Sequence, residues 1–202
     1  NKILSMSVGS KYVKDYTHCP FASKSNIIDC GITIKEFNPE TIQYVKNDFS
    51  KTVKSPDFFK LDGYIISIKK TMNSIDELTS GFKKLMYHLN DELTYVNMQE
   101  PNWRFSFEKE TFFVVVMSSI YKPHSTRWVP EGHFVLFQPE HSFHKHIPRE
   151  NREMVSSSIR RLFLKHGCDY GNIIIDAAES QKYIFPLNQE DKLINWWYDC
   201  AE

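Results

Sequence analysis

The sequence lacks the patterns of several common site classes. It has only seven glycines, and none of them forms GxGxxG or GxxxxGK, so a Gly-rich phosphate-binding loop is excluded. There is no GxSxG elbow and no local signature of a cysteine protease, so nucleophilic catalysis has little support. The four cysteines contain no CxxC pair, which argues against a zinc ribbon or a thioredoxin-type site; they are Cys19, Cys30, Cys168 and Cys200.

An excess of charge and a long apolar run are also absent. The 25 basic and 25 acidic residues give a formal net charge of zero, so we expect no general affinity for nucleic acid. No apolar run approaches the roughly 18 residues of a membrane span, and we expect no membrane insertion. Scattered cysteines are typical of reduced, cytoplasmic chains, and a Cys19–Cys30 disulfide is the open alternative.

What the sequence does contain is enough apolar material for one domain. Its 202 residues are 41% hydrophobic and include fifteen phenylalanines, which predicts a single domain over residues 1–202 with residues 1–15 as a loosely held lead-in. Strand-like and helix-like patterns alternate, so we expect an α+β fold with a central mixed or antiparallel sheet flanked by helices. The predicted strands are 27–34, 64–68, 102–107, 112–117, 134–137 and 173–175.

Three helices have recognisable ends in the sequence. Asn38 followed by Pro39 predicts a helix start, with the helix running to about Phe49. Ser74 and Glu77 form a capping box before an apolar stripe that continues to Val96. A third helix is predicted from 148 to a glycine stop at 167. The paired tryptophans 196 and 197 are expected to pack the C-terminal segment down, and a homodimer is left open.

Candidate functional residues follow two of the predicted strands. The polar loop 118–128 carries His124 and Arg127, and an arginine can bind a carboxylate through two parallel hydrogen bonds. The segment after the next strand is rich in histidine, with His141, His144 and His146. These three could hold a metal or haem iron, or could form a polar surface. Without an HExxH or CxxC…HxxxH spacing the surface interpretation is favoured.

The motifs occur in an order that resembles a known family. They are HCPFA (18–22), WRFSFEKETFFVVVM (103–117), PHSTR (123–127), FQPEHSF (137–143), SIR (158–160) and SQKY (180–183). This series is similar to that of the YqcI/YcgG family, whose members of known activity are haem-dependent N-oxygenases. The histidine of FQPEHSF lies one position later than in the family's Phe-Asn-Pro-His-x-x-Phe, and the loop before PHSTR is about two residues longer.

The resemblance implies a function and a cofactor. It predicts a cytoplasmic monooxygenase that uses haem b, dioxygen and an external electron donor to hydroxylate a nitrogen of an arginine-like amino acid or an amine. Haem needs an apolar slot, an axial side chain and cations for its propionates. On this prediction His124 is the axial iron ligand, with His141 as runner-up and Cys19 as a thiolate alternative. The remaining cofactor contacts are assigned to Arg127, Arg160, Trp103, Phe112 and Phe137.

Two other hypotheses stay open. The departures in the histidine-bearing motifs are also compatible with a protein that binds haem, for example as a sensor, without catalysis. A non-haem metal protein that uses the 141–146 histidines is the third hypothesis.

Overall fold

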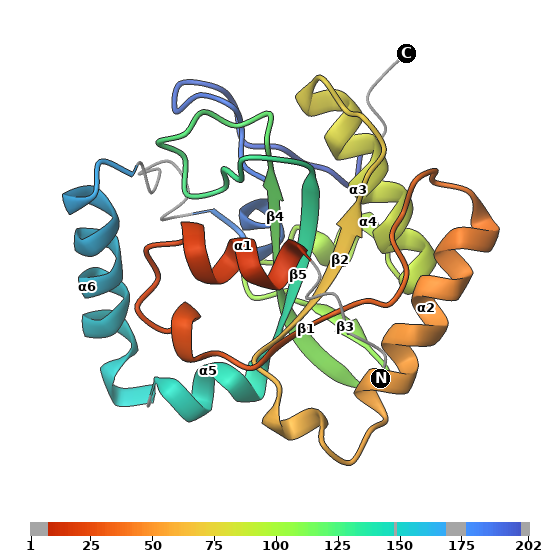
Figure 1. Cartoon of the computed structure of the whole chain (residues 1–202), viewed down its shortest axis with the longest axis horizontal. Helices are drawn as coiled ribbons and strands as arrows, with labels where there is room; N and C mark the ends of the chain where they lie inside the picture. The colour runs from red at the N-terminus through yellow and green to blue at the C-terminus, as the bar shows by residue number, and fades with distance from the viewer. Residues whose placement is uncertain (1–7, 148, 169–176, 199–202) are drawn as a thin grey trace, which may run out of the picture.

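The computed structural model describes residues 8–147, 149–168 and 177–198, and these form an α+β domain (Figure 1). The helices are α1 (Val8–Tyr16), α2 (Pro39–Val53), α3 (Ile75–Leu89), α4 (Tyr95–Met98), α5 (Glu140–His146) and α6 (Arg152–Lys165). The strands are β1 (Ile27–Asp29), β2 (Gly63–Ile68), β3 (Phe105–Phe107), β4 (Glu110–Ser118) and β5 (His133–Pro139). Short 3-10 turns are η1 (Ala22–Lys24), η2 (Phe58–Lys60), η3 (Arg149–Asn151) and η5 (Glu179–Lys182).

The described strands form one open, mixed sheet in the order β1-β2-β5-β4-β3. β1 and β2 are parallel, and the other neighbours are antiparallel. The register sets Val115 opposite Leu136, and Leu136 opposite Ile65. The predicted fold class, a mixed sheet flanked by helices, is therefore confirmed. The predicted strand 173–175 lies outside the described residues.

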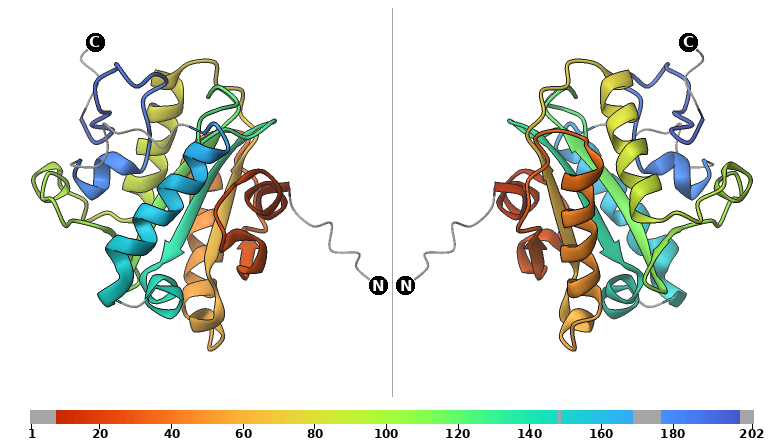
Figure 2. Two further views of the ribbon diagram at one scale, coloured as in Figure 1. Left: turned by 90° about the vertical axis from the view of Figure 1, so that its left-hand side faces the viewer. Right: turned by 90° about the vertical axis from the view of Figure 1, so that its right-hand side faces the viewer.

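The two faces of the sheet carry different layers, with α1 and α3 on opposite sides of it (Figure 2). The larger core lies between the sheet and the α2–α3 side, and it includes Phe49, Phe82, Phe112 and Phe137. The smaller cluster lies under α1 and includes Val13, Ile65, Met117, Phe134 and Leu136. The alternation of side chains along each strand separates the two clusters.

Helix α1 corrects the prediction of a loose lead-in for residues 8–15. Its residue Val13 is buried in the smaller cluster. Gly9 permits the close approach of α1 to the sheet, because a Cβ there would lie 2.7 Å from both Asp29 Oδ1 and Ile65 Cγ2. The backbone N–H of Ser10 donates to the same Asp29 Oδ1 at 3.1 Å. The segment is short and mostly polar, so its helical pattern carried little signal in the sequence.

Two predicted helix starts are confirmed by their capping bonds. Asn38 Oδ1 accepts a hydrogen bond from Thr41 N at 2.8 Å, and Ser74 Oγ accepts one from Glu77 N at 3.2 Å. The return bond of Glu77 differs from the usual capping box, because its carboxylate accepts from Asn73 N instead of Ser74 N.

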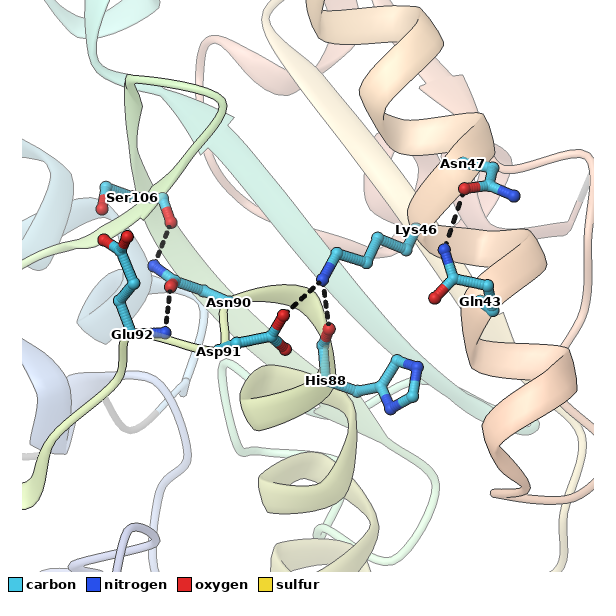
Figure 3. Close-up of polar contacts among 8 residues, drawn as sticks. All are labelled: Gln43, Lys46, Asn47, His88, Asn90, Asp91, Glu92 and Ser106. Atoms are coloured by element: carbon cyan, nitrogen blue, oxygen red, sulfur yellow. Dashed lines mark hydrogen bonds and ion pairs between the residues drawn. The ribbon is translucent and has the colours of Figure 1, made fainter.

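Helix α3 ends at Leu89, earlier than the apolar stripe predicted. Asn90 leaves the helical conformation, with φ −131° and ψ 105°. Its side chain donates to Ser106 O at 2.8 Å and accepts from Glu92 N at 2.9 Å, as Figure 3 shows. Lys46 of α2 donates to His88 O, which is one of the last carbonyls of α3 (Figure 3). Tertiary contacts at Asn90 therefore end the helix before Val96.

Candidate functional site

A cavity of about 380 Å³ lies on the α1 side of the sheet. This volume falls at the lower end of the range for small-molecule sites. Its floor is the sheet face formed by Ile27, Phe113, Val115, Met117, Leu136 and Gln138. The N-terminal segment and α6 form two of its walls: Val13, Cys19 and Phe21 lie on one side, and Ser156, Ile159 and Phe163 on the other.

The cavity combines an apolar floor with basic side chains. Arg127, Arg160 and Lys182 line it, together with the carboxylates of Asp62 and Glu179. Lys182 and Glu179 form an ion pair at 2.8 Å, so this pair adds little net charge. The two arginines give the cavity its cationic character, which suits a ligand that carries carboxylates.

A hydrogen bond and a cation–π contact help to hold Arg127 in place. Only 6% of it is exposed, and its Nη2 donates to the carbonyl of Lys182 at 2.7 Å. Its guanidinium carbon also lies 3.9 Å from the ring centre of Phe185, which is a cation–π contact. The loop that carries it is fixed to the sheet, because Ser118 N donates to Arg127 O at 2.9 Å. Arg127 thus presents a fixed positive charge at the cavity.

Cys19, which carries a thiol, lines the cavity wall. Burial raises the pKa of its thiol, and the backbone N–H groups of Phe21 and Ala22 act in the opposite direction by favouring the thiolate. The thiol therefore stays protonated until a cation binds it, and a coordinated metal ion deprotonates a thiol. Met117 is a second sulfur-containing residue that lines the cavity.

The two predicted histidine ligands lie outside this cavity. His124 is exposed in the polar loop. His141 Nε2 lies 3.0 Å from the carbonyl oxygen of Leu61, and its ring packs edge-on against Phe58. A carbonyl only accepts, so Nε2 of His141 carries the hydrogen in this contact and its lone pair is not available there. Neither imidazole is directed at the cavity.

Three of the predicted slot residues also lie away from the cavity. Phe112 and Phe137 are fully buried in the larger core, where both rings contact Phe49 of α2. Trp103 packs at the edge of the same core, with its ring centre 6.1 Å from that of Tyr183. The neighbours Phe113 and Gln138 line the cavity instead. The apolar run 112–117 has no polar position to indicate which face is which, so its pattern does not separate the residues that line the cavity from those of the larger core.

The structure brings together Arg127, Arg160 and Cys19, which sequence reasoning did identify. It adds Asp62, Ser142 and Lys182, which sequence reasoning missed. Asp62 directly precedes a strand, and Ser142 lies inside FQPEHSF, shortly after another strand. Their positions next to strand ends could have indicated these two residues as site candidates.

His141 and His144 do not converge. His144 Nε2 faces Glu140 Oε1 at 3.7 Å, whereas His141 faces Leu61. Within residues 8–147, 149–168 and 177–198, no group of three or more His, Cys, Asp or Glu side chains is arranged to hold a metal ion. Over the same ranges, no helix has both the length and the apolar character that crossing a bilayer requires.

Comparison with known proteins gives one match. A model of the YqcI/YcgG family matches residues 89–174. The matched segment contains β3, β4, β5, α5 and α6, and so includes most of the cavity floor and the α6 wall. The match supports the family assignment that the ordered motifs indicated. No curated protein and no solved structure matches the chain.

Proposed function

We propose, on the premise that the chain is related to the YqcI/YcgG family, that it is a haem-dependent monooxygenase acting on a nitrogen of a small amino acid or amine. The observation that carries the proposal is the cavity, which joins an apolar floor, a fixed arginine and a sulfur donor. Haem, dioxygen and an external electron donor are the partners this function requires.

The residues of the cavity fit the chemistry of haem in three respects. The apolar floor and the α6 wall suit a macrocycle, and Arg127 and Arg160 suit its carboxylates. The residue that would bind the iron is the point at which the proposal departs from the sequence-based prediction. Cys19 would hold the iron in place of His124 and His141, because Cys19 lines the cavity and neither histidine does.

When bound, the haem iron supplies the activation of dioxygen. The chain itself binds and orients the ligand, and it shields the reacting atoms from water. Arg127 holds a carboxylate through its fixed guanidinium, as its contacts with Lys182 O and Phe185 leave it little freedom. Val115, Leu136 and Ile159 keep the cavity apolar and so exclude water from the reacting atoms.

A haemin titration of the purified protein tests the proposal. We expect one haem per chain and loss of that binding in Ile159→Trp, since the larger ring fills the cavity from α6. Met154→Trp is the matched control, because Met154 lies on the same helix and is 64% exposed. Equal haem uptake by both variants would place the cofactor elsewhere.

Oxygen consumption separates catalysis from simple haem binding. With a reductant and an amine or amino acid, the haem-loaded protein should consume dioxygen and yield an N-hydroxylated product. Stoichiometric haem without substrate-dependent oxygen uptake would support a non-catalytic haem protein instead.

A further inference from the structure

A polar side chain, that of Gln138, lies in the otherwise apolar floor of the cavity. Gln138 is on β5, two residues after Leu136, so both side chains lie on the face of the sheet that carries the cavity. The intervening Phe137 is fully buried in the larger core on the opposite face. On β4 the partner of Gln138 is Phe113, which also lines the cavity. The strand register therefore fixes the position of this amide in the floor.

The amide of Gln138 is available to a ligand. Three hydroxyl groups that line the cavity are already engaged in hydrogen bonds with other protein atoms, and they belong to Thr17, Ser25 and Ser142. The side-chain amide of Gln138, in contrast, forms no hydrogen bond with any residue that the structure describes. Leaving an amide without partners in apolar surroundings costs free energy, so a ligand that covers the floor has to satisfy it.

The chemistry of the amide restricts the group that can satisfy it. The side chain of Gln138 carries a carbonyl acceptor and an NH2 donor side by side. A carboxamide offers the complementary pair, so two amides can join through parallel N–H···O bonds. A ketone or a carboxylate only accepts, and the carbonyl oxygen of Gln138 would stay unpaired against it. A site built to hydrogen-bond a group discriminates against an analogue that lacks it.

Arg127 lies further along the sheet and can bind the other end of such a ligand. Its Nη2 donates to Lys182 O, and the adjacent Tyr183 O accepts from Val116 N on β4. Val116 lies three residues beyond Phe113, the partner of Gln138, which is roughly 10 Å at about 3.3 Å per residue. A short chain with a carboxylate at one end and a carboxamide at the other can therefore reach both residues.

We infer that Gln138 is a specificity-determining residue, which binds a neutral carboxamide group of a ligand whose carboxylate binds Arg127. The cavity then distinguishes a carboxamide from a ketone of the same shape, although neither group is charged. The inference deepens the proposed function by naming a neutral group that the substrate carries. It rests on that function only for placing the ligand in this cavity, and it does not require haem.

Calorimetric titration of the purified protein with two probes tests the inference. One probe is adipamate, and the other is its isostere in which a methyl group replaces the amide NH2. Both carry one carboxylate, so Arg127 contributes equally and the difference reports the amide. We expect adipamate to bind about ten-fold more tightly, the effect of one or two neutral hydrogen bonds in an apolar site. Equal affinities, or no binding of adipamate, would overturn the inference.

The variant Gln138→Leu should abolish the preference, because an apolar side chain neither accepts nor donates. Its free energy of unfolding should not fall, since the amide has no bond to the described residues to lose, and urea denaturation measures this. The matched control is Gln43→Leu on the exposed side of α2, outside the cavity wall, which should keep the preference. A ten-fold preference that survives in folded Gln138→Leu would contradict the assignment.

Two hydroxyls of the cavity walls are the competing partners for a carboxamide. Thr126 lies on the polar loop and Ser156 on α6, and neither side chain bonds another residue in the described part of the chain. Each hydroxyl offers a single donor, and both lie off the sheet floor. Thr126→Val and Ser156→Ala should keep the preference for adipamate. Its loss in one of them, together with its survival in Gln138→Leu, would assign the amide to that wall and overturn the inference.

Haem binding is measured separately, so the two proposals can fail independently. A preference for adipamate that depends on Gln138, without haem uptake, would overturn the proposed function and keep Gln138 as a ligand contact. Haem uptake with equal affinity for the two probes would do the reverse.

Discussion

The guanidinium of Arg127 stacks on the ring of Phe185, with 3.9 Å between its central carbon and the ring centre. This contact and the bond to Lys182 O fix one buried positive charge beside an apolar floor. A lysine cannot reproduce a planar guanidinium that stacks and donates in parallel. The cationic end of the cavity depends on this geometry as well as on charge.

Arg127→Lys should therefore weaken binding of a carboxylate-bearing ligand by roughly ten-fold, which is about 1.4 kcal/mol. It should also lower the free energy of unfolding by about 1–3 kcal/mol, because the carbonyl of Lys182 loses a buried partner. Haemin titration and urea denaturation measure the two effects. Lys122→Arg, on an exposed side chain of the same loop, is the control. Unchanged affinity in Arg127→Lys would remove this residue from the site.

Adjacent phenylalanines on opposite faces of β4 should behave differently. Phe112 is fully buried in the larger core, so Phe112→Ala should reduce the free energy of unfolding by about 3–5 kcal/mol. Phe113 lines the cavity, so Phe113→Ala should cost less stability and change ligand affinity more. Urea denaturation and ligand titration of both variants provide the comparison. A larger change of affinity in Phe112→Ala would contradict the assignment of faces.

The buried His133 should make stability depend on pH. Burial lowers its pKa from the ordinary 6.5, so the folded protein binds fewer protons here than the unfolded chain does. The free energy of unfolding is therefore unaffected by this group above pH 6.5 and falls progressively below it, by at most about 1.4 kcal/mol per pH unit.

Chemical denaturation of the wild type and of His133→Gln measures this dependence of stability on pH. A range of about pH 5 to 8 brackets the titration of a histidine. Glutamine cannot titrate, so the variant should show a flatter profile below pH 6.5. The imidazole Nδ1 lies 2.7 Å from Ser118 Oγ, so some loss of stability at all pH values is expected as well. Parallel profiles for the two proteins would assign the acid sensitivity to other groups.

The hairpin between β3 and β4 offers a stabilising substitution. Glu108 and Lys109 both have positive φ, at 50° and 69°, a conformation that non-glycine residues rarely adopt. Lys109→Gly should raise the free energy of unfolding by a few tenths to about 1 kcal/mol, as glycine removes the strain at this turn. The control Glu110→Gly lies at the first residue of β4, where it pairs with Phe107, and should be destabilising. Lower stability in Lys109→Gly would show that its backbone is not strained.

The sequence predicted the parts of the fold that depend on local chemistry. Asn38 and Ser74 begin helices because their side chains accept backbone N–H groups three residues on, and both bonds are present. The early end of α3 could not be predicted from the neighbouring sequence, because it depends on a hydrogen bond from Asn90 to Ser106, which is 16 residues away in the chain.

The candidate site was predictable only in part. Arg127 was identified because it lies in a loop after a strand and can bind a carboxylate through two hydrogen bonds, and Arg160 because it lies in the SIR motif of the family resemblance. Both line the cavity. His124 followed a strand in the same way but points to solvent. Its exposure depends on how the 118–128 loop folds over Phe185, and no short-range pattern encodes that contact.

The most direct test is the absorption spectrum of the haemin-reconstituted protein in its ferrous–CO form, recorded for the wild type, Cys19→Ser and Cys30→Ser. Cys30 is the matched control because it is buried in the larger core, away from the cavity. The account predicts a thiolate-type band in the wild type and Cys30→Ser, and its loss in Cys19→Ser. A histidine-type band that survives in Cys19→Ser and disappears in His124→Ala or His141→Ala would contradict it.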